Sequence, residues 1–135
     1  MTPIFQALAC HAQDRPDAIA FRDGERSMTW ADLARAVSRA AAGFAAGPRC
    51  VGLALAGLDY VIGDLAATLA GCRVVPVPGF FSAGQVAHLL ADSGATLTDR
   101  LPAGATGLPL AYAGGGHAGD LYVGDHGPPQ GRDSG

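Results

Sequence analysis

Hydrophobic residues recur every three or four positions in four stretches of the first hundred residues, and this spacing predicts four amphipathic helices. The first is expected to begin at Thr2 and Pro3. Thr29 and Asp32 have the spacing of a capping box and are expected to open the second. The apolar sides of these two helices carry Ile4 and Leu8 beside His11, and Leu33, Val37, Ala40 and Phe44.

The third and fourth predicted helices have clear end signals. The third is expected to begin at Asp59 and to stop at Gly71. The fourth begins with a second capping box, Ser82 and Gln85, and Gly94 closes it. Their apolar positions are Ile62, Leu65 and Leu69 in the third, and Val86, Leu89 and Leu90 in the fourth.

Short apolar runs between the helices predict strands. Two of them flank Asp23-Gly24, a dipeptide typical of hairpin turns, and one is apolar throughout, as in a strand covered on both faces. Pro76 has no N–H to donate, so we expect its strand at a sheet edge or near its own end. The predicted strands are Ala18–Arg22, Arg26–Met28, Cys50–Leu55, Arg73–Val77 and Ala95–Thr98.

The elements therefore follow the order helix, hairpin, helix, strand, helix, strand, helix, strand. This alternation predicts an α/β fold with a mostly parallel sheet, right-handed crossovers and flanking helices on both faces. The connections are short enough for consecutive strands to be neighbours in the sheet.

Composition changes near Arg100. Glycine and proline together make up 15% of residues 1–100 and 40% of residues 101–135, and the second part has no helix or strand periodicity. We expect an α/β subdomain over residues 1–100 and a Gly/Pro-rich, irregular and disordered tail over residues 101–135.

Charge and cysteine content exclude several classes of protein. The net charge is −3 with no basic cluster, which argues against a surface for nucleic acid or anionic membranes. The longest uncharged run, residues 101–119, is too rich in glycine and proline for a membrane span, and the first twelve residues resemble no targeting signal. Three well-separated cysteines, Cys10, Cys50 and Cys72, indicate reduced thiols and a cytoplasmic protein.

All nine basic residues are arginine, and the chain contains neither lysine nor asparagine. Because lysine and asparagine have AT-rich codons, while the abundant alanine and glycine have GC-rich ones, this composition indicates a GC-rich genome. Chemistry that requires a lysine is excluded from this chain.

Three segments together carry a resemblance to a known family. They are residues 15–20 (RPDAIA), 28–33 (MTWADL) and 69–77 (LAGCRVVPV). In this order and at this spacing they are similar to the beginning of adenylate-forming, AMP-binding ligases, which include acyl-CoA synthetases and the adenylation domains of nonribosomal peptide synthetases. Residues 80–82 and 91–95 also fit, so the resemblance covers residues 4–98. It implies the start of the large amino-terminal domain of that fold, with an incomplete sheet.

The resemblance implies an ATP-dependent, AMP-forming ligase that activates a carboxylic acid as its adenylate and passes the acyl group to a thiol of coenzyme A or a carrier protein. In such enzymes a Ser/Thr/Gly-rich loop ending in P-K-G holds the ATP phosphates with Mg²⁺, and a carboxy-terminal domain supplies a lysine. This chain carries no such loop as written and no lysine, so we expect no catalytic, cofactor-binding or metal residue in it.

Four side chains deserve separate interpretation. Trp30 begins a predicted helix, where an aromatic side chain is usually a core anchor and only occasionally a ligand platform. His11 and His88 have no paired carboxylate that the sequence pattern singles out, and we interpret both as structural. Cys72 follows the carboxyl end of a helix, a poor place to lower a thiol pKa.

The tail has a second interpretation at the level of codons. If the reading frame moves forward by one base, each new codon consists of the last two bases of one codon and the first base of the next. The amino-acid sequence fixes its first and third base, and only its middle base, the old wobble base, is free. Residues 122–132 are then compatible with T-S-G-T-T-G-P-P-K-G-V, which resembles the phosphate loop of the family in the expected place. We therefore expect a frameshift, in the genome or in its sequencing, upstream of Tyr122 and between Arg100 and Gly119.

These observations leave two functions open. The first is the amino-terminal fragment of an AMP-forming acid ligase, inactive by itself. The alternative is a non-catalytic α/β interaction module, or one half of a split ligase whose remainder is its partner. A Rossmann-type nucleotide site near Gly52 and Gly57 has little support, because no G-x-G-x-x-G follows that strand. A partial sheet leaves open edges, and we expect self-association through the segments Cys50–Leu55 and Arg73–Val77.

Overall fold

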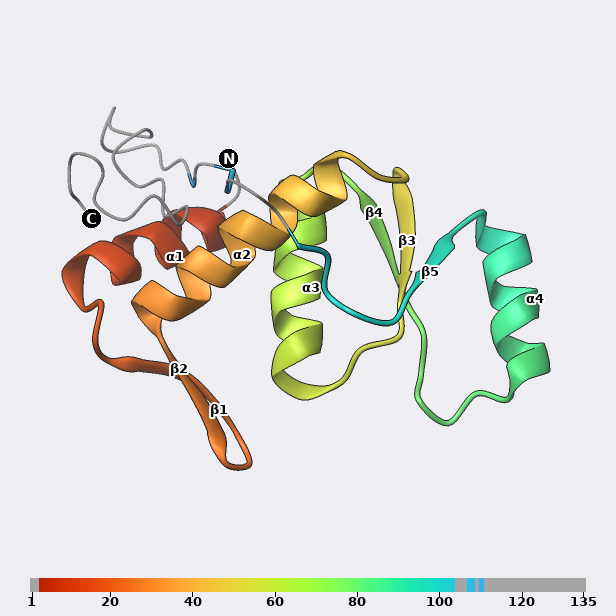
Figure 1. The fold of residues 1–135 in the computed structure, drawn as a ribbon, viewed down its shortest axis with the longest axis horizontal. Helices are drawn as coiled ribbons and strands as arrows, with labels where there is room; N and C mark the ends of the chain where they lie inside the picture. The colour runs from red at the N-terminus through yellow and green to blue at the C-terminus, as the bar shows by residue number, and fades with distance from the viewer. Residues whose placement is uncertain (1–2, 104–106, 109, 111–135) are drawn as a thin grey trace.

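The computed structural model describes residues 3–103, 107–108 and 110. Thr2 and the codon-shifted segment after Tyr122 lie outside these residues. Within the described residues there are four helices and five strands, and the strands form a two-stranded hairpin and a three-stranded parallel sheet (Figure 1). This confirms the α/β class. In chain order they are α1 Pro3–Asp14, β1 Ile19–Asp23, β2 Arg26–Thr29, α2 Trp30–Ala45, β3 Cys50–Leu53, α3 Gly57–Leu69, β4 Arg73–Pro76, α4 Ala83–Ser93 and β5 Thr96–Thr98.

Both predicted capping boxes lie at helix starts. The Thr29 hydroxyl accepts a hydrogen bond from the Asp32 N–H at 3.1 Å, and α2 begins directly after Thr29. At α4 the box is reciprocal, because Ser82 and Gln85 exchange hydrogen bonds of 2.8 and 3.2 Å between side chain and backbone. Gly94 ends α4 in the left-handed conformation, as predicted.

The hairpin turn lies one residue later than predicted. Asp23 still pairs with Arg26 in the antiparallel ladder, so Gly24 and Glu25 form the two-residue turn, with φ +61° at Gly24. The reason is that Asp23 has another partner. Its carboxylate accepts a hydrogen bond from the Leu58 N–H at 2.9 Å and thereby caps α3, which begins two residues before the predicted Asp59.

The buried side of the first helix overlaps the predicted one only in part. Phe5, Leu8 and Ala9 are buried, whereas Ile4 is 55% exposed. These three positions have the i, i+3, i+4 spacing of one helix face, and α1 packs this face against α2. The prediction that Leu8 lies on the buried side is confirmed, and the same prediction for Ile4 was wrong.

The parallel sheet has the order β4-β3-β5, so β5 lies beside β3 and not beside its predecessor β4. Gly52 of β3 has no side chain, and this lets Leu90 of α4 approach so closely that a Cβ at Gly52 would lie 2.9 Å from it. The connection from β4 to β5 through α4 can therefore pass over β3, so that β5 pairs with the other edge of β3. Pro76 lies at the end of β4 on the sheet edge, as predicted.

The order also corrects the expectation about open edges. The segment that begins at Cys50 forms the central strand β3, in which Val51, Gly52 and Leu53 are buried. Among the residues that the structure describes, β4 and β5 form the two edges of this sheet. Helix α3 covers one face of the sheet and α4 the other (Figure 1), which confirms helices on both faces.

The core lies mainly between α1, α2, α3 and the inner strand β3. The residues after Arg100 that the structure describes also contribute to it. Leu110 is fully buried in the main cluster, and Leu108 exchanges hydrogen bonds with Ser38, donating its N–H to the Ser38 carbonyl at 2.8 Å and accepting from the Ser38 hydroxyl. Pro102 packs against Gly43 so closely that a Cβ there would lie 2.6 Å from Pro102 Cβ.

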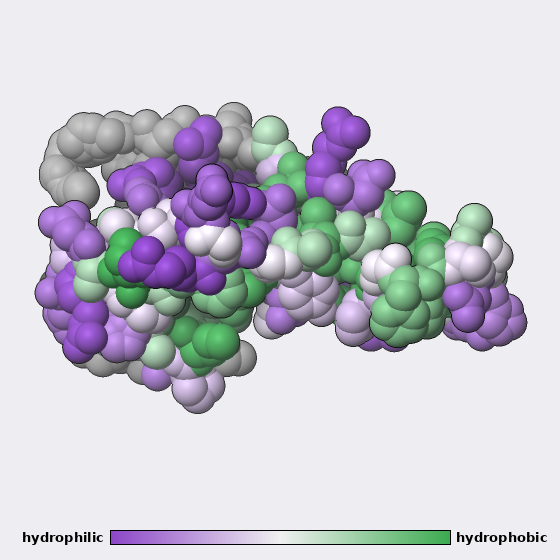
Figure 2. Space-filling view, turned by 90° about the horizontal axis from the view of Figure 1, so that it is seen from below, coloured by the Kyte–Doolittle hydropathy of each residue, from purple (hydrophilic) through white to green (hydrophobic). Residues whose placement is uncertain are grey.

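By contrast, α4 has no buried residue. Apolar residues reach the surface at the end of the molecule where α4 lies, interspersed with polar ones (Figure 2). Phe80, in the loop before α4, is 85% exposed.

Candidate functional site

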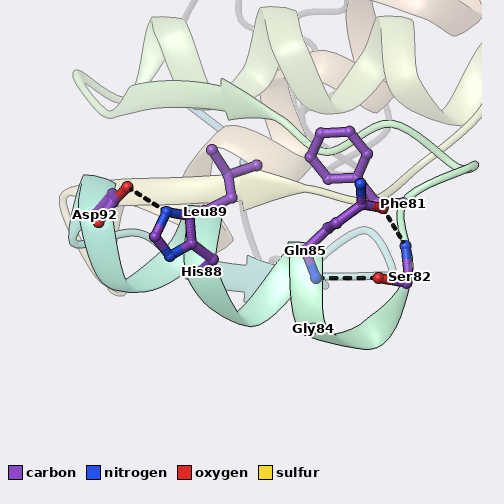
Figure 3. A pocket seen from close by; sticks show the side chains of 7 residues that line it. All are labelled: Phe81, Ser82, Gly84, Gln85, His88, Leu89 and Asp92. Atoms are coloured by element: carbon purple, nitrogen blue, oxygen red, sulfur yellow. Dashed lines mark hydrogen bonds and ion pairs between the residues drawn. The ribbon is translucent and has the colours of Figure 1, made fainter.

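A groove of about 600 Å³ lies beside α4 (Figure 3). Its walls come from the end of the loop before α4 and from one side of the helix. Phe81 and Leu89 supply apolar surface, and the remaining lining residues are polar or glycine: Ser82, Gly84, Gln85, His88 and Asp92.

The polar atoms at the start of the groove are used by the capping box. The Ser82 hydroxyl accepts from the Gln85 N–H, and the Gln85 side-chain oxygen accepts from the Ser82 N–H. No base is shown within hydrogen-bond distance of the Ser82 hydroxyl among the described residues. Ser82 is therefore engaged in helix formation and not arranged as an activated nucleophile.

His88 and Asp92 form an ion pair in the same groove, with Nε2 and Oδ2 3.1 Å apart (Figure 3). The interpretation of His88 as lacking a paired carboxylate was wrong. The i, i+4 spacing of the two residues on a predicted helix was the available signal. Their side chains are 79% and 67% exposed, so this is an ordinary surface ion pair.

Trp30 and His11 contact each other at the junction of α1, the hairpin and α2. Their ring centroids are 4.5 Å apart, and the Trp30 backbone N–H donates to the Ala18 carbonyl at 3.0 Å. Trp30 is half-buried against the core. This placement agrees with the interpretation of Trp30 as a core anchor.

Cys72 is buried, and its sulfur lies 3.4 Å from the Pro48 carbonyl and 3.8 Å from the Phe44 carbonyl. Cys10 and Cys50 are half-buried, and none of the three forms a disulfide. Burial raises the pKa of the Tyr60 phenol, and the nearby Asp64 carboxylate raises it further.

The best-connected arginines hold helix ends together. Arg49 donates to carbonyls at the end of α2, Phe44 at 2.8 Å and Ala45 at 3.2 Å, and to the Ala70 carbonyl after α3 at 3.1 Å. Arg73 donates to the Ser93 carbonyl at the end of α4 at 2.7 Å. Cations at carboxyl ends of helices complement the helix dipole. These guanidinium groups are therefore committed to the fold.

Within residues 3–103, 107–108 and 110, no three His, Cys, Asp or Glu side chains converge on a point that could hold a metal ion. No helix in this part of the chain is both long and apolar enough to cross a membrane.

Comparison with known proteins identifies the family to which the chain belongs. The AMP-binding enzyme family matches residues 8–99, more than half of the chain. The chain belongs to the AMP-binding enzyme family. No curated protein matches it in sequence.

Solved AMP-binding proteins share its fold. The nonribosomal peptide synthetase FmoA3 (S1046A), in its α-methyl-L-serine-AMP-bound form, gives a TM-score of 0.63 at 23% identity, over 75% of this chain and 13% of that chain. The o-succinylbenzoate CoA synthetase from Bacillus subtilis, in complex with the acyl-adenylate intermediate OSB-AMP, gives 0.61 at 26% identity, over 71% and 26%. IdnL7 gives 0.58 at 33% identity, over 70% and 20%.

The structure of this chain therefore matches the amino-terminal part of the adenylate-forming fold. The matched region spans 13% of the length of the FmoA3 chain, 26% of the Bacillus subtilis o-succinylbenzoate CoA synthetase and 20% of IdnL7. Nothing in the structure tests the prediction that the chain carries no catalytic, cofactor-binding or metal residue.

Proposed function

We propose that this chain is the amino-terminal portion of an ATP-dependent, AMP-forming carboxylic acid ligase. The family match over residues 8–99 carries the proposal. Two of the structural relatives were solved with an aminoacyl-AMP or acyl-adenylate bound. In the intact reaction a carboxylate oxygen attacks the α-phosphorus of ATP, which releases pyrophosphate and leaves an acyl-adenylate. A thiol of coenzyme A or a carrier protein then takes the acyl group and releases AMP.

The 135-residue chain by itself is proposed to be inactive. Stabilising the charge on a transferring phosphoryl group requires cationic donors held where that charge develops. The sequence contains no lysine, and Arg49 and Arg73 are bonded to helix-end carbonyls. Asp125 places a negative charge where the shifted frame would encode a threonine of the phosphate loop.

We further propose that the reading frame changes after Leu110 and before Tyr122. The later limit is supported by residues 122–132, which are all compatible with the phosphate-loop sequence one base forward. The earlier limit is supported by the packing of the segment after Arg100. Leu108 forms hydrogen bonds to Ser38 through its N–H and its carbonyl, and Leu110 is buried in the core, as expected if the native reading frame continues to Leu110.

The cytoplasm is the compartment we propose, because the three cysteines are free thiols and Cys72 is buried without a partner sulfur.

The nucleotide sequence from codon 100 to well past codon 135 tests the proposal. We expect an open frame, one base forward, that spells the phosphate loop and continues for several hundred codons. Wobble bases that do not spell the loop would overturn the frameshift. A separate downstream gene that begins with the missing core would instead indicate a split ligase, and early stop codons an eroded fragment.

A further inference from the structure

The two edges of the parallel sheet differ in their capacity to accept a further strand. On β4, the N–H groups of Arg73 and Val77 donate to carbonyls of the β3 segment. The alternate residues Val74 and Pro76 therefore direct their backbone groups outward. Because Pro76 has no N–H to donate, a strand added at this edge would lack a ladder hydrogen bond.

The outer edge of β5 has no such obstacle. The Thr98 carbonyl accepts from the Ala54 N–H at 2.9 Å, so the N–H and C=O of Leu97 are directed outward. Among the residues that the structure describes, no strand pairs with this side of β5, and the Leu97 side chain is 43% exposed. We call residues 95–99, on this outer side, the β5 edge.

The β5 edge is complementary to itself. Two copies that pair antiparallel about a twofold axis at Leu97 place each Leu97 opposite the other, and the two residues can then exchange both N–H···O=C bonds. The same register places Thr96 opposite Thr98, and threonine pairs directly across an antiparallel ladder are favourable.

The side chains along this edge alternate between the two faces of the sheet. A Cβ at Gly52 would lie 2.9 Å from Leu90 of α4 and 3.7 Å from the Ala95 Cβ, so Ala95 points to the face that α4 covers. Leu97 pairs in register with Gly52 and points to the same face. By the period of two, a strand that continues to Asp99 directs its carboxylate to this face as well.

Charge complementarity supports the same register. Asp99 of one copy lies opposite Ala95 of the other, two residues after Ser93, whose carbonyl accepts from the Arg73 guanidinium at 2.7 Å. The pairing therefore brings a carboxylate beside a guanidinium, and the twofold axis repeats this contact. Asp99 is accessible for it, because its side chain is 68% exposed and lies 3.9 Å from Arg100 Nε in its own copy.

We propose that the chain forms a closed homodimer in which β5 pairs antiparallel with β5 of a second copy about Leu97. The two three-stranded sheets then become one continuous sheet with the strand order β4-β3-β5-β5-β3-β4. Its outer edges are both β4, where Pro76 limits further pairing, so association stops at the dimer. This surface and its occupant go beyond the proposed function and do not depend on it.

Sedimentation velocity of residues 1–135 over a range of concentrations tests the pairing. Leu97→Pro removes the outward N–H of the β5 edge in both copies, and Val74→Pro is its matched control on β4. Asp99→Arg opposes the Arg73 guanidinium, and Glu25→Arg makes the same charge change in the hairpin turn. Circular dichroism checks that each variant keeps its helix content.

We expect a reversible equilibrium between monomer and dimer for the unsubstituted chain and for both controls, with the same Kd. Leu97→Pro and Asp99→Arg should raise the Kd at least tenfold. If Leu97→Pro loses helix content, Asp99→Arg decides, because that side chain is exposed.

A cross-link tests the register directly. In a hydrogen-bonded antiparallel pair the opposed Cα atoms are about 5.5 Å apart, within the range of roughly 4.4–6.8 Å that a disulfide spans. Under mild oxidation Leu97→Cys should therefore give a covalent dimer, whereas Val74→Cys on β4 should not exceed the background of the unsubstituted chain with its own three cysteines.

A chain that stays monomeric at every concentration would overturn the proposal, and the β5 edge would then be available to a different partner. Species larger than a dimer would overturn the closed arrangement. An unchanged Kd for Asp99→Arg together with no cross-link at position 97 would overturn the register. None of these results depends on the reading frame after Leu110, so they are distinguishable from a failure of the proposed function.

Discussion

The Asp23 carboxylate accepts a hydrogen bond from the Leu58 N–H at 2.9 Å, and this contact fixes the β1–β2 hairpin to the start of α3. Thirty-five residues separate the two partners. A second contact between the same elements joins Arg26 to Asp59 at 3.3 Å. The hairpin thus supplies the N-cap that α3 lacks within its own sequence, since Ala56 at the cap position makes no side-chain hydrogen bond.

Gly57→Ala should therefore be strongly destabilising. Gly57 has φ +59°, and a Cβ there would lie 2.2 Å from Asp23 Oδ2. Gly24 has nearly the same φ, +61°, with no atom within 4 Å of its Cβ position, so Gly24→Ala is the matched control for backbone strain alone. We expect Gly24→Ala to cost about 1 kcal/mol and Gly57→Ala at least about 2 kcal/mol in urea unfolding. Equal losses would show that the contact with Asp23 has no energetic role.

Arg49→Ala should lower stability more than a typical surface arginine. Its guanidinium donates to carbonyls at the ends of both α2 and α3 and thereby joins the two helix ends. We expect a loss of about 1–2 kcal/mol. Arg35 pairs with Asp32 at 3.0 Å on an exposed helix surface, so the control Arg35→Ala should cost less than about 0.5 kcal/mol. Chemical denaturation of both variants would distinguish the two roles.

Truncation should show that the fold extends beyond Arg100. A chain ending at Arg100 loses the burial of Leu110, worth roughly 1.5–3 kcal/mol, together with the Ser38–Leu108 hydrogen bonds. A chain ending at Leu110 keeps them. We expect the unfolding midpoint of residues 1–110 to equal that of residues 1–135, and that of residues 1–100 to be clearly lower. Equal midpoints for all three chains would contradict a role for this segment in the core.

Self-association of residues 1–135 should increase with concentration. Among the described residues, α4 has no buried side chain, Phe80 is 85% exposed and no strand pairs with the outer edge of β5. Exposed strand edges and apolar surface promote association. Sedimentation velocity is the appropriate measurement. A chain that stays monomeric and melts cooperatively at high concentration would favour a self-sufficient interaction module over a portion of a larger domain.

Local signals made most of this fold predictable. Capping pairs at Thr29 and Ser82, the glycine at Gly94 and the apolar periodicity identify helices and strands with ends shifted by few residues. The i, i+4 pair of His88 and Asp92 was equally readable from the sequence but was not recognised.

Contacts between distant segments were not predictable in this way. The cap of Asp23 on Leu58 joins residues far apart, and the placement of β5 beside β3 depends on the space left by Gly52. Composition alone gives no indication that Leu110, in a Gly/Pro-rich segment, belongs to the core. These features arise from packing in three dimensions, which periodicity does not encode.

Carboxylate-dependent release of pyrophosphate from ATP tests the central claim most directly. It should be measured for purified residues 1–135 and for the protein obtained when the reading frame is restored after Leu110, with ATP, Mg²⁺ and a panel of fatty and aryl acids. We predict no release above the buffer blank for residues 1–135, and acid-dependent release for the restored protein with at least one acid. Acid-dependent release by residues 1–135 alone, or none by the restored protein with any acid, would contradict the account.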